Sequence, residues 1–595
     1  MKLKSLVALL VVAVMIFAAC NTGGGTGDAA PPADTPAATT DTAATDTPAD
    51  TADAPAAGDR EQVRFRMHYF YDWYSFQPWA GDAVTRHWGE MFNIYMYQQR
   101  PDANPEEVLN LMIAADDLPD VIWMERSPQN VQMARLGLFV PVDEMVARSD
   151  NNWYHENVMA STQRFFEIDG VNYIIPNWAR MGVVGVPGGA TGGNEAWMVT
   201  TNAWEAVGSP SFATFYDLFD YAVAIRDADL TNAAGVPMVP MLFNGGPNYG
   251  VDFVNQAVYR SFGGHGPNGG WWWGLQEDGT MGSRFRVPLW REAVLETNRW
   301  VREGLIPVTN FTNTYEEFLA NLNTGRGGLV FYDHSQDDGN SFRRILREGD
   351  PGNSIEVVTI PGAGHGGADA LYPPAFGIPP VEIYHQVHET LGWNGSFITR
   401  SAAEPDRIFE FLTWLLTPMG SIEMMFGPPG YMWDELDANG YPILHTPPGV
   451  LTSEELRDIG AWNWAIAGHA NNVDNAKFAA NAALPEDQRN WVETIQQTIF
   501  TPNMMLSDEF VAINLVIDPG TDLHISRTLI EDTFEAQFPL ILMADSREEA
   551  ERMFDELLAF AEANGMAGIE EVYNARYQEN VAMQGGSVFS PPVMR

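Results

Sequence analysis

Carboxylates and histidines are the side chains of this sequence that could perform acid–base catalysis or bind a metal. The eleven histidines are scattered without the spacing of a metal site, so each is expected to be a core or surface residue, and no metal is predicted. Asp116, Asp117 and Asp120 suggest the paired carboxylates that hydrolyse glycosidic bonds. Their position between an expected helix and an expected strand instead favours a loop that caps and aligns a sheet.

A glycine-rich segment at residues 362–367 matches the GxGxxG pattern of dinucleotide-binding loops. Such a site also needs a helix that begins at the last glycines, so that the helix N-terminus faces the pyrophosphate. Pro373 and Pro374 follow instead, and no helical period appears. HExxH, P-loop lysine and GxSxG motifs are absent from the sequence. The sequence therefore predicts no cofactor, and none of these motifs indicates an enzyme.

Aromatic residues gather where strands are expected to end. Residues 69–74 read Tyr-Phe-Tyr-Asp-Trp-Tyr at the end of the first expected strand, and Trp178 follows another strand end. Three consecutive tryptophans occupy 271–273 in a segment rich in Gly and Asn, and three adjacent side chains are not expected to point into one core. Trp and Tyr faces stack on the C–H faces of sugar rings, while Asp and Asn bind hydroxyl groups. A single aromatic residue is more often part of a core, but this pattern favours a carbohydrate ligand.

The candidate ligand-binding residues lie in loops beside expected strand ends. Stacking faces are expected from Trp73, Trp178, Trp271, Trp272 and Trp433, and polar contacts from Asp72, Asn244, Asp333 and His334. Trp197 and Trp204 fall inside an expected strand and helix, so both are assigned to the core.

Alternating strand and helix signals would position these residues. Strands are expected at 63–70, 94–98 and 120–124, with one helix at 82–92 and another that begins after Asn104. This βαβαβ order predicts a parallel sheet covered by helices. The same order recurs farther along the chain and indicates a second α/β unit, and the C-terminal third is expected to be mostly helical.

Length and charge restrict the class of protein. The chain has 595 residues, enough for more than one domain, and 45% of them are hydrophobic, as in globular proteins. It carries 33 basic and 78 acidic residues, a formal net charge of −45. Nucleic acid is therefore excluded as an expected partner, because phosphate recognition needs a concentrated basic surface. The single cysteine excludes a disulfide within the chain.

The N-terminal residues predict export and anchoring. A short basic segment precedes an apolar run at residues 6–19, which is shorter than the roughly 20 residues that span a bilayer. Cys20 follows two alanines, so 1–20 is expected to be a signal peptide that ends in a lipidated cysteine and resembles the lipobox of bacterial lipoproteins. The alternative is an ordinary signal peptide with a chance cysteine. Residues 21–60, rich in Ala, Thr, Asp and Pro, are expected to form a disordered tether.

Six ordered segments carry a resemblance to a known family. They are Asp117-Leu-Pro-Asp-Val-Ile, Asp169 to Pro176, Glu195 to Trp204, Gly325-Arg-Gly-Gly, Glu404 to Pro418 and Phe426 to Trp433. In this order the chain resembles the family 1 extracellular solute-binding proteins of ABC importers, particularly the large lipoproteins of oligosaccharide uptake. The glycine-rich segment at 362–367 and the three tryptophans have no general counterpart in that family.

The resemblance implies an α/β fold of two lobes, a periplasmic-binding-protein-like clamshell of type II with a helical C-terminal region. Lobe 1 would hold 61–185 plus 390–425, and lobe 2 would hold 186–389 plus 426–595. The implied function is to capture a carbohydrate, expected to be an oligosaccharide, and to deliver it to ABC permease subunits.

The implied protein is a monomer outside the bacterial cytoplasmic membrane, attached to it by a lipid anchor only. Two alternatives stay open. One is a secreted, lipid-anchored glycoside hydrolase, and the other is the same binding fold with a peptide or sugar-acid ligand. Cleavage of a bound glycan would distinguish the hydrolase from the binding protein.

Overall fold

The structure is a computed structural model. It describes residues 60–584 except 72–73, 75, 150–151, 159, 179–195, 245–248, 263, 265–271, 277, 333–334, 359–386, 389–391, 393, 462–465, 498–504, 507, 511–512 and 514–515.

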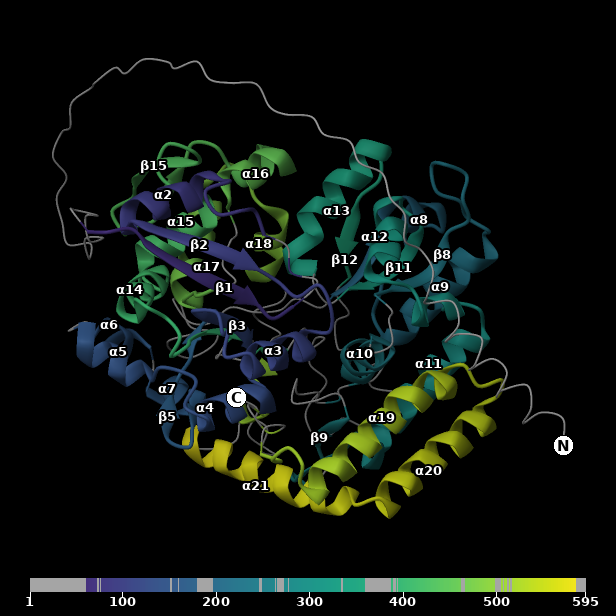
Figure 1. Ribbon diagram of the computed structural model, residues 1–595. Helices are drawn as coiled ribbons and strands as arrows, with labels where there is room; N and C mark the ends of the chain where they lie inside the picture. Colours follow the sequence, from purple (N-terminus) through teal and green to yellow (C-terminus); the bar gives the residue numbers. More distant parts are fainter. Residues whose placement is uncertain are drawn as a thin grey trace, which may run out of the picture. The chain divides into compact units, whose positions relative to one another are not determined.

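A five-stranded sheet forms the first α/β unit (Figure 1). Its strands, in spatial order, are β2 (Ile94–Gln99), β1 (Val63–Tyr69), β3 (Val121–Glu125), β14 (Asn394–Ile398) and β6 (Ile175–Pro176). The pairs β1–β2 and β1–β3 are parallel, which confirms the predicted βαβαβ order, whereas β14 is antiparallel to both β3 and β6. One strand from far along the chain therefore completes this sheet.

Local signals explain the crossover helices of this sheet, α2 (Ala83–Phe92) and α3 (Pro105–Ala114). The Asn104 side chain accepts a hydrogen bond from the backbone N–H of Glu107, and Pro105 occupies the first turn of α3. The Asp82 side chain caps α2 in the same way. These contacts use residues within one turn of each other, which is why the sequence alone predicts both starts.

A four-stranded sheet forms the second α/β unit. Its order is β12 (Ile355–Val357), β7 (Ala196–Thr200), β11 (Gly327–Tyr332) and β8 (Val239–Phe243). Strands β11 and β8 are parallel, and β7 is antiparallel to both β11 and β12. Trp197 lies 1% exposed in the core on this sheet, as predicted, with its ring edge against Phe331. The two sheets are open and separate in the described part of the chain, which confirms an α/β fold with two units.

Helices cover the two sheets. Those of the first part of the chain are α4 (Pro128–Arg135), α5 (Val142–Ser149), α6 (Trp153–Asn157) and α7 (Ala160–Phe166). Those that follow β7, β8 and β11 include α8 (Thr201–Ala206), α9 (Phe215–Asp227), α11 (Pro288–Arg302), α12 (Tyr315–Asn323) and α13 (Ser335–Gly349). After β14 come α14 (Pro405–Leu415), α15 (Pro418–Phe426), the hairpin β15 (Trp433–Leu436) and β16 (Pro442–Leu444), α16 (Ser453–Ile459), α17 (Ala470–Ala483) and α18 (Trp491–Ile495).

Residues that follow α15 pack against elements of the first sheet. The Ser396 hydroxyl of β14 donates to the carbonyl of Ile466 at 2.6 Å, and the N–H of Gly468 donates to the carbonyl of Pro176 at 3.1 Å. Helix α17 packs on α15 in one shared core. The lobe boundaries stay a prediction, but these contacts favour placing 426–483 with the first lobe rather than with the second.

The C-terminal helices are α19 (Asp522–Leu542), α20 (Arg547–Ala563) and α21 (Met566–Gln584), and Figure 1 shows α19 and α20 side by side. Their buried residues belong to the same core as those of β8, β11 and α11. Helix α20 begins after Ser546, whose hydroxyl accepts a hydrogen bond from the N–H of Glu549 at 3.1 Å. The helical C-terminal region is thus part of the second unit.

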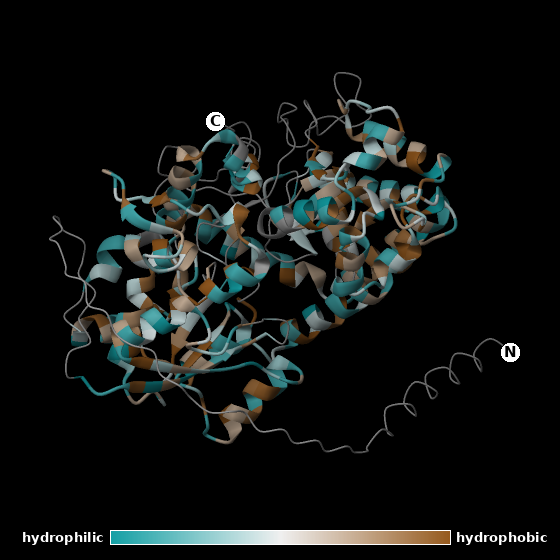
Figure 2. Cartoon of the chain, turned by 90° about the horizontal axis from the view of Figure 1, so that it is seen from above, coloured by the Kyte–Doolittle hydropathy of each residue, from teal (hydrophilic) through white to brown (hydrophobic). Residues whose placement is uncertain are grey.

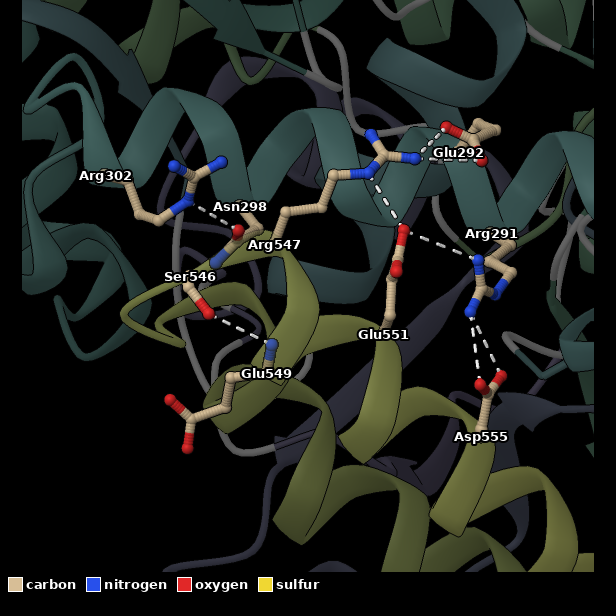
Figure 3. A network of polar contacts seen from close by, with 9 residues as sticks. All are labelled: Arg291, Glu292, Asn298, Arg302, Ser546, Arg547, Glu549, Glu551 and Asp555. Atoms are coloured by element: carbon tan, nitrogen blue, oxygen red, sulfur yellow. Dashed lines mark hydrogen bonds and ion pairs between the residues drawn. The ribbon is translucent and has the colours of Figure 1, made fainter.

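Ion pairs join α20 to α11 on the outside of this core (Figure 3). Arg547 donates to Glu292 and to Glu551, each at 2.9 Å. Arg291 lies 3.2 Å from Asp555. Exposed pairs of this kind contribute about 0.2–1 kcal/mol each, so the buried apolar residues supply most of the attachment.

No helix among the described residues is long and apolar enough to cross a membrane. Figure 2 shows hydrophilic and hydrophobic residues interspersed along the helices, which is the pattern of helices with one face on a core.

Candidate ligand-binding site

Half-buried aromatic rings and two polar side chains meet where the strands of the first sheet end. Strands β1 and β3 finish at this edge and the antiparallel β14 begins there, with Asn394 opposite Glu125 in the register. We call Tyr71, Tyr74, Phe76, Glu125 and Asn394 the first edge. Ligands of open α/β sheets bind outside the carboxyl ends of the strands, so this is where a binding site is expected.

Tyr71 joins the two polar residues of the first edge. Its hydroxyl donates to Asn394 Oδ1 at 3.0 Å and accepts a hydrogen bond from the backbone N–H of Glu125 at 3.0 Å. Asn394 is 2% exposed, and within the described ranges its Nδ2 has no hydrogen-bond partner. Leaving a buried donor unpaired costs about 1–3 kcal/mol. A ligand hydroxyl that accepted from Nδ2 would remove this cost.

The rings of the first edge rest on a buried aromatic layer made of Tyr69 and Trp123. Tyr74 lies 4.6 Å from Tyr69 and 4.9 Å from Trp123 between ring centroids, and Phe76 stacks on Tyr69 at 4.9 Å. Burial raises the pKa of Tyr71 and of Tyr74, so both hydroxyls stay protonated at physiological pH. The edge thus combines rigid apolar surface with neutral hydroxyl groups.

Glu125 is exposed to solvent, yet burial is the main cause of its raised pKa. The charge of Arg126 and a hydrogen bond with Tyr71 oppose this rise.

Trp178 is the predicted stacking residue that lies next to this edge. The preceding residue, Asn177, donates its N–H to the carbonyl of Asn394 at 3.0 Å and accepts from the N–H of Asn394 at 3.1 Å. The Trp178 ring is half-buried against the core of α15 and α17. Gly392 has φ +69°, and a Cβ there would lie 2.9 Å from the Trp178 backbone, so only glycine allows this approach.

Asn244 lies at the edge of the second sheet where β8 ends, as Asn394 lies at the first edge where β3 ends. It directly follows β8, whose end lies beside that of β11 because Phe243 and Phe331 are paired. The residue is 6% exposed, and no described residue pairs with its Oδ1. The predicted polar residues Asp333 and His334 directly follow β11 but lie outside the described residues. Each sheet therefore ends in a buried amide with one polar atom that no described residue satisfies.

Trp272 lies in the core, not in a binding loop. It is 4% exposed, with ring centroids of Phe534 and Phe538 at 5.2 and 5.4 Å. Trp273 points into the same core against Tyr573 and donates to Glu531 at 2.8 Å. Trp272 and Trp273 thus share one core, while the expectation for all three tryptophans stays a prediction because Trp271 lies outside the described residues. Trp272 packs on Phe534 and Phe538 of α19, whereas Trp273 packs on Tyr573 of α21 and is hydrogen-bonded to Glu531 of α19.

Trp433 is also a core residue in this structure. It is 3% exposed and its Nε1 donates to the carbonyl of Gly427 at 2.9 Å, which fixes the turn after α15. The remaining candidates, Asp72, Trp73 and Trp271, lie outside the described residues, as does Cys20.

The sequence reasoning missed Glu125 and Asn394 and named Tyr71 only as part of an aromatic run. Tyr71 could have been found from its place after the first strand. Glu125 ends a strand without any motif around it, and Asn394 reaches the edge only because β14 pairs with β3. Among the described residues, no group of three or more His, Cys, Asp or Glu side chains is arranged to hold a metal ion.

Comparison with known proteins places the fold. No family model and no curated protein matches the sequence, but solved structures do. The alginate-binding protein AlgQ2 is 16% identical, with a TM-score of 0.60 over 88% of this chain and 99% of its own. The Streptococcus pneumoniae ABC-transporter substrate-binding protein FusA, in complex with kestose, is 14% identical, with a TM-score of 0.61 over 88% of this chain and 100% of its own.

An HMO-binding, ABC-transporter-associated solute-binding protein from Bifidobacterium longum infantis is 13% identical. Its TM-score is 0.58, over 88% of this chain and 100% of its own. The chain has the fold of these solute-binding proteins. The likeness extends over nearly the whole length of each of them and over 88% of this chain.

Proposed function

We propose that this chain is an extracytoplasmic solute-binding protein of an ABC importer, which captures a carbohydrate between two lobes and delivers it unchanged to permease subunits. The observation that carries the proposal is the pair of buried amides, Asn394 and Asn244, each with an unsatisfied polar atom at the end of a different sheet. Sugar hydroxyls both donate and accept hydrogen bonds, so they can satisfy the Asn394 donor and the Asn244 acceptor together.

The half-buried rings of the first edge support a carbohydrate. Tyr74 and Phe76 are rigidly backed and partly exposed, which suits stacking on sugar C–H faces. A ligand that bonds Asn394 in one unit and Asn244 in the other would favour the closed arrangement, because both contacts form only there. Closure then gives the permease a conformation that distinguishes the ligand-bound protein from the ligand-free protein.

The structural neighbours support an oligosaccharide and a transport partner. They include an alginate-binding protein, a complex with kestose and two ABC-transporter components. We extend to this chain the role of binding without cleavage. We also propose attachment to the outer face of the cytoplasmic membrane through lipidated Cys20, with residues 21–60 as a tether and the protein acting as a monomer.

The test is a titration of the full chain, purified in a detergent without a sugar headgroup, with a panel of oligosaccharides and peptides. Tryptophan fluorescence and calorimetry should detect binding of an oligosaccharide, and the thermal midpoint should rise with its concentration. Asn394→Ala and Asn244→Ala should each weaken this binding about five- to tenfold, the loss of roughly one hydrogen bond.

Asn298→Ala is the matched control, because this buried amide donates only to the carbonyls of Ile541, Leu542 and Ala544 at the end of α19. It should lower the melting temperature and leave the Kd unchanged. A panel in which no glycan binds would sink the proposal. Shortened sugars recovered after incubation would instead support a glycoside hydrolase.

A further inference from the structure

Half-buried aromatic rings lie at two places along one edge of the first sheet. Strands β1, β3 and β6 all end at this edge, because β14 is antiparallel to both β3 and β6. At the ends of β1 and β3, Phe76 stacks on Tyr69 at 4.9 Å. Tyr74 lies 4.9 Å from Trp123 between ring centroids. At the end of β6, Trp178 follows the strand after one residue. We call the rings of Tyr74 and Phe76 the β1 platform and the ring of Trp178 the β6 platform.

Backbone contacts fix each platform to its own part of the sheet. Arg100, which directly follows β2, donates from Nη1 to the carbonyl of Tyr74 at 3.0 Å. Beside the other platform, the N–H of Asn177 donates to the carbonyl of Asn394 at 3.0 Å, and Trp178 is the next residue. The distance between the two platforms is therefore set by the sheet.

The two platforms border adjoining cores. Tyr74 and Phe76 pack on the core that contains Tyr69 and Trp123 of the sheet. Trp178 packs on the core that α15 and α17 share. Met419 of α15 packs on both of these cores, so the cores meet at this helix. One ligand that lies along the edge can therefore contact both platforms.

The strand order gives the separation of the platforms. Strands β1, β3, β14 and β6 are neighbours in this order. Adjacent strands lie about 4.8 Å apart, so three spacings place β1 and β6 roughly 14 Å apart. Asn394 begins β14, between the platforms, and no described residue satisfies its Nδ2. One pyranose unit lengthens a glycan by about one strand spacing. Two rings can therefore cover one platform and Asn394, whereas three or four rings can reach both platforms.

We propose that the first edge and Trp178 form one extended site for a glycan of at least three sugar rings. One outer ring stacks on each platform, and an inner ring accepts a hydrogen bond from Asn394 Nδ2. The rings of one glycan are linked, so the second stacking contact forms at a high effective concentration and adds to the affinity. The inference rests on the proposed function, because it gives the length of the carbohydrate that the same site takes.

The test measures the Kd of the full chain, in a detergent without a sugar headgroup, for malto-, cello- and manno-oligosaccharides of two and four rings. In a series that binds, the four-ring glycan should bind at least tenfold more tightly than the two-ring glycan. We call this ratio the length gain. Trp178→Ala and Phe76→Ala should each reduce the length gain below threefold, because the remaining platform contacts a short glycan as well as a long one.

Trp204→Ala is the matched control. Trp204 is also half-buried, but it packs on the core of the second unit and its Nε1 donates to the carbonyl of Pro210 at 2.9 Å. Its removal should lower the melting temperature and leave the length gain unchanged. Trp178→Tyr keeps a flat ring at the β6 platform and should keep a length gain of at least fivefold.

Melting temperatures establish which variants are folded, and Phe76→Ala decides the test if Trp178→Ala does not fold. Equal affinity of the unmodified chain for two and four rings would overturn the inference and leave the proposed function intact. A length gain that stays above threefold in the folded platform variants would do the same. Failure of all three glycan series to bind would overturn both.

Discussion

Three buried ionisable residues meet between α17 and α18, far in the chain from the binding residues. Lys477 Nζ lies 3.1 Å from Asp474 Oδ1 and donates to Gln496 Oε1 at 2.9 Å. Glu493 is 3% exposed, and burial raises its pKa to about 8 although the charge of Lys477 opposes the rise. Lys477 thus forms its ion pair with Asp474, and Glu493 stays protonated at neutral pH.

Glu493→Gln should make the protein more stable at alkaline pH. The folded-state pKa of about 8 exceeds the ordinary glutamate pKa of 4.5. Between these two pH values the folded chain therefore holds a proton that the unfolded chain has lost. The stability of the unmodified protein therefore falls as pH rises from 4.5 through 8. The variant lacks this loss, and its advantage should reach on the order of 5 kcal/mol at pH 8.5.

Melting temperatures at pH 5 and pH 8.5 measure this difference. The advantage of Glu493→Gln should be small at pH 5 and larger at pH 8.5. Parallel pH profiles for the two proteins would show that Glu493 ionises in the folded state as it does in water.

At the scale of elements, the short hairpin of β9 (Trp273–Leu275) and β10 (Met281–Ser283) is held between helices. Side chains of α21 accept hydrogen bonds from its backbone, with Asn574 on Met281 N at 3.1 Å and Glu570 on Ser283 N at 3.0 Å. A two-stranded hairpin is marginal by itself, so these helix contacts and the buried tryptophans stabilise it. Its residues serve the core of the second unit.

Trp272→Ala should therefore destabilise the fold without weakening ligand binding. Removing a fully packed Trp costs about 3–5 kcal/mol, which calorimetry would record as a lower melting temperature. Below that temperature the Kd for an oligosaccharide should stay within about twofold, whereas Tyr74→Ala at the first edge should weaken binding more than it lowers stability. If the Trp272→Ala protein is folded but binds the oligosaccharide much more weakly, Trp272 contacts the ligand after all.

For the whole molecule, a net charge of −45 and the acidic composition of residues 21–60 disfavour attachment to an anionic bilayer through the protein surface. A covalent lipid on Cys20 would supply it. Cys20→Ser, expressed in bacteria that process lipoproteins, should lose fatty-acid labelling and move from the membrane fraction to the soluble fraction, with unchanged glycan affinity. A variant that stayed in the membrane fraction would point to another attachment, and an unlabelled, released parent chain would indicate an ordinary signal peptide.

Features that depend on neighbours in the chain could be predicted. Asn104 and Pro105 start α3, Ser546 starts α20, and alternating apolar periods give the βαβαβ order, because capping and periodicity act within one or two turns. The sequence by itself thus determined the local elements and the division into two α/β units. It also placed Asn244 at a strand end.

Tertiary structure determines where the first edge lies and which tryptophan side chains are buried. Asn394 joins Tyr71 and Glu125 because β14 pairs with β3, a contact between segments far apart in the chain that leaves no local signal. Trp272 and Trp433 occupy loop-like sequence, yet the helices that fold over them bury both rings. Local spacing determines which way the backbone turns, but the exposure of a side chain depends on what the rest of the chain packs against it.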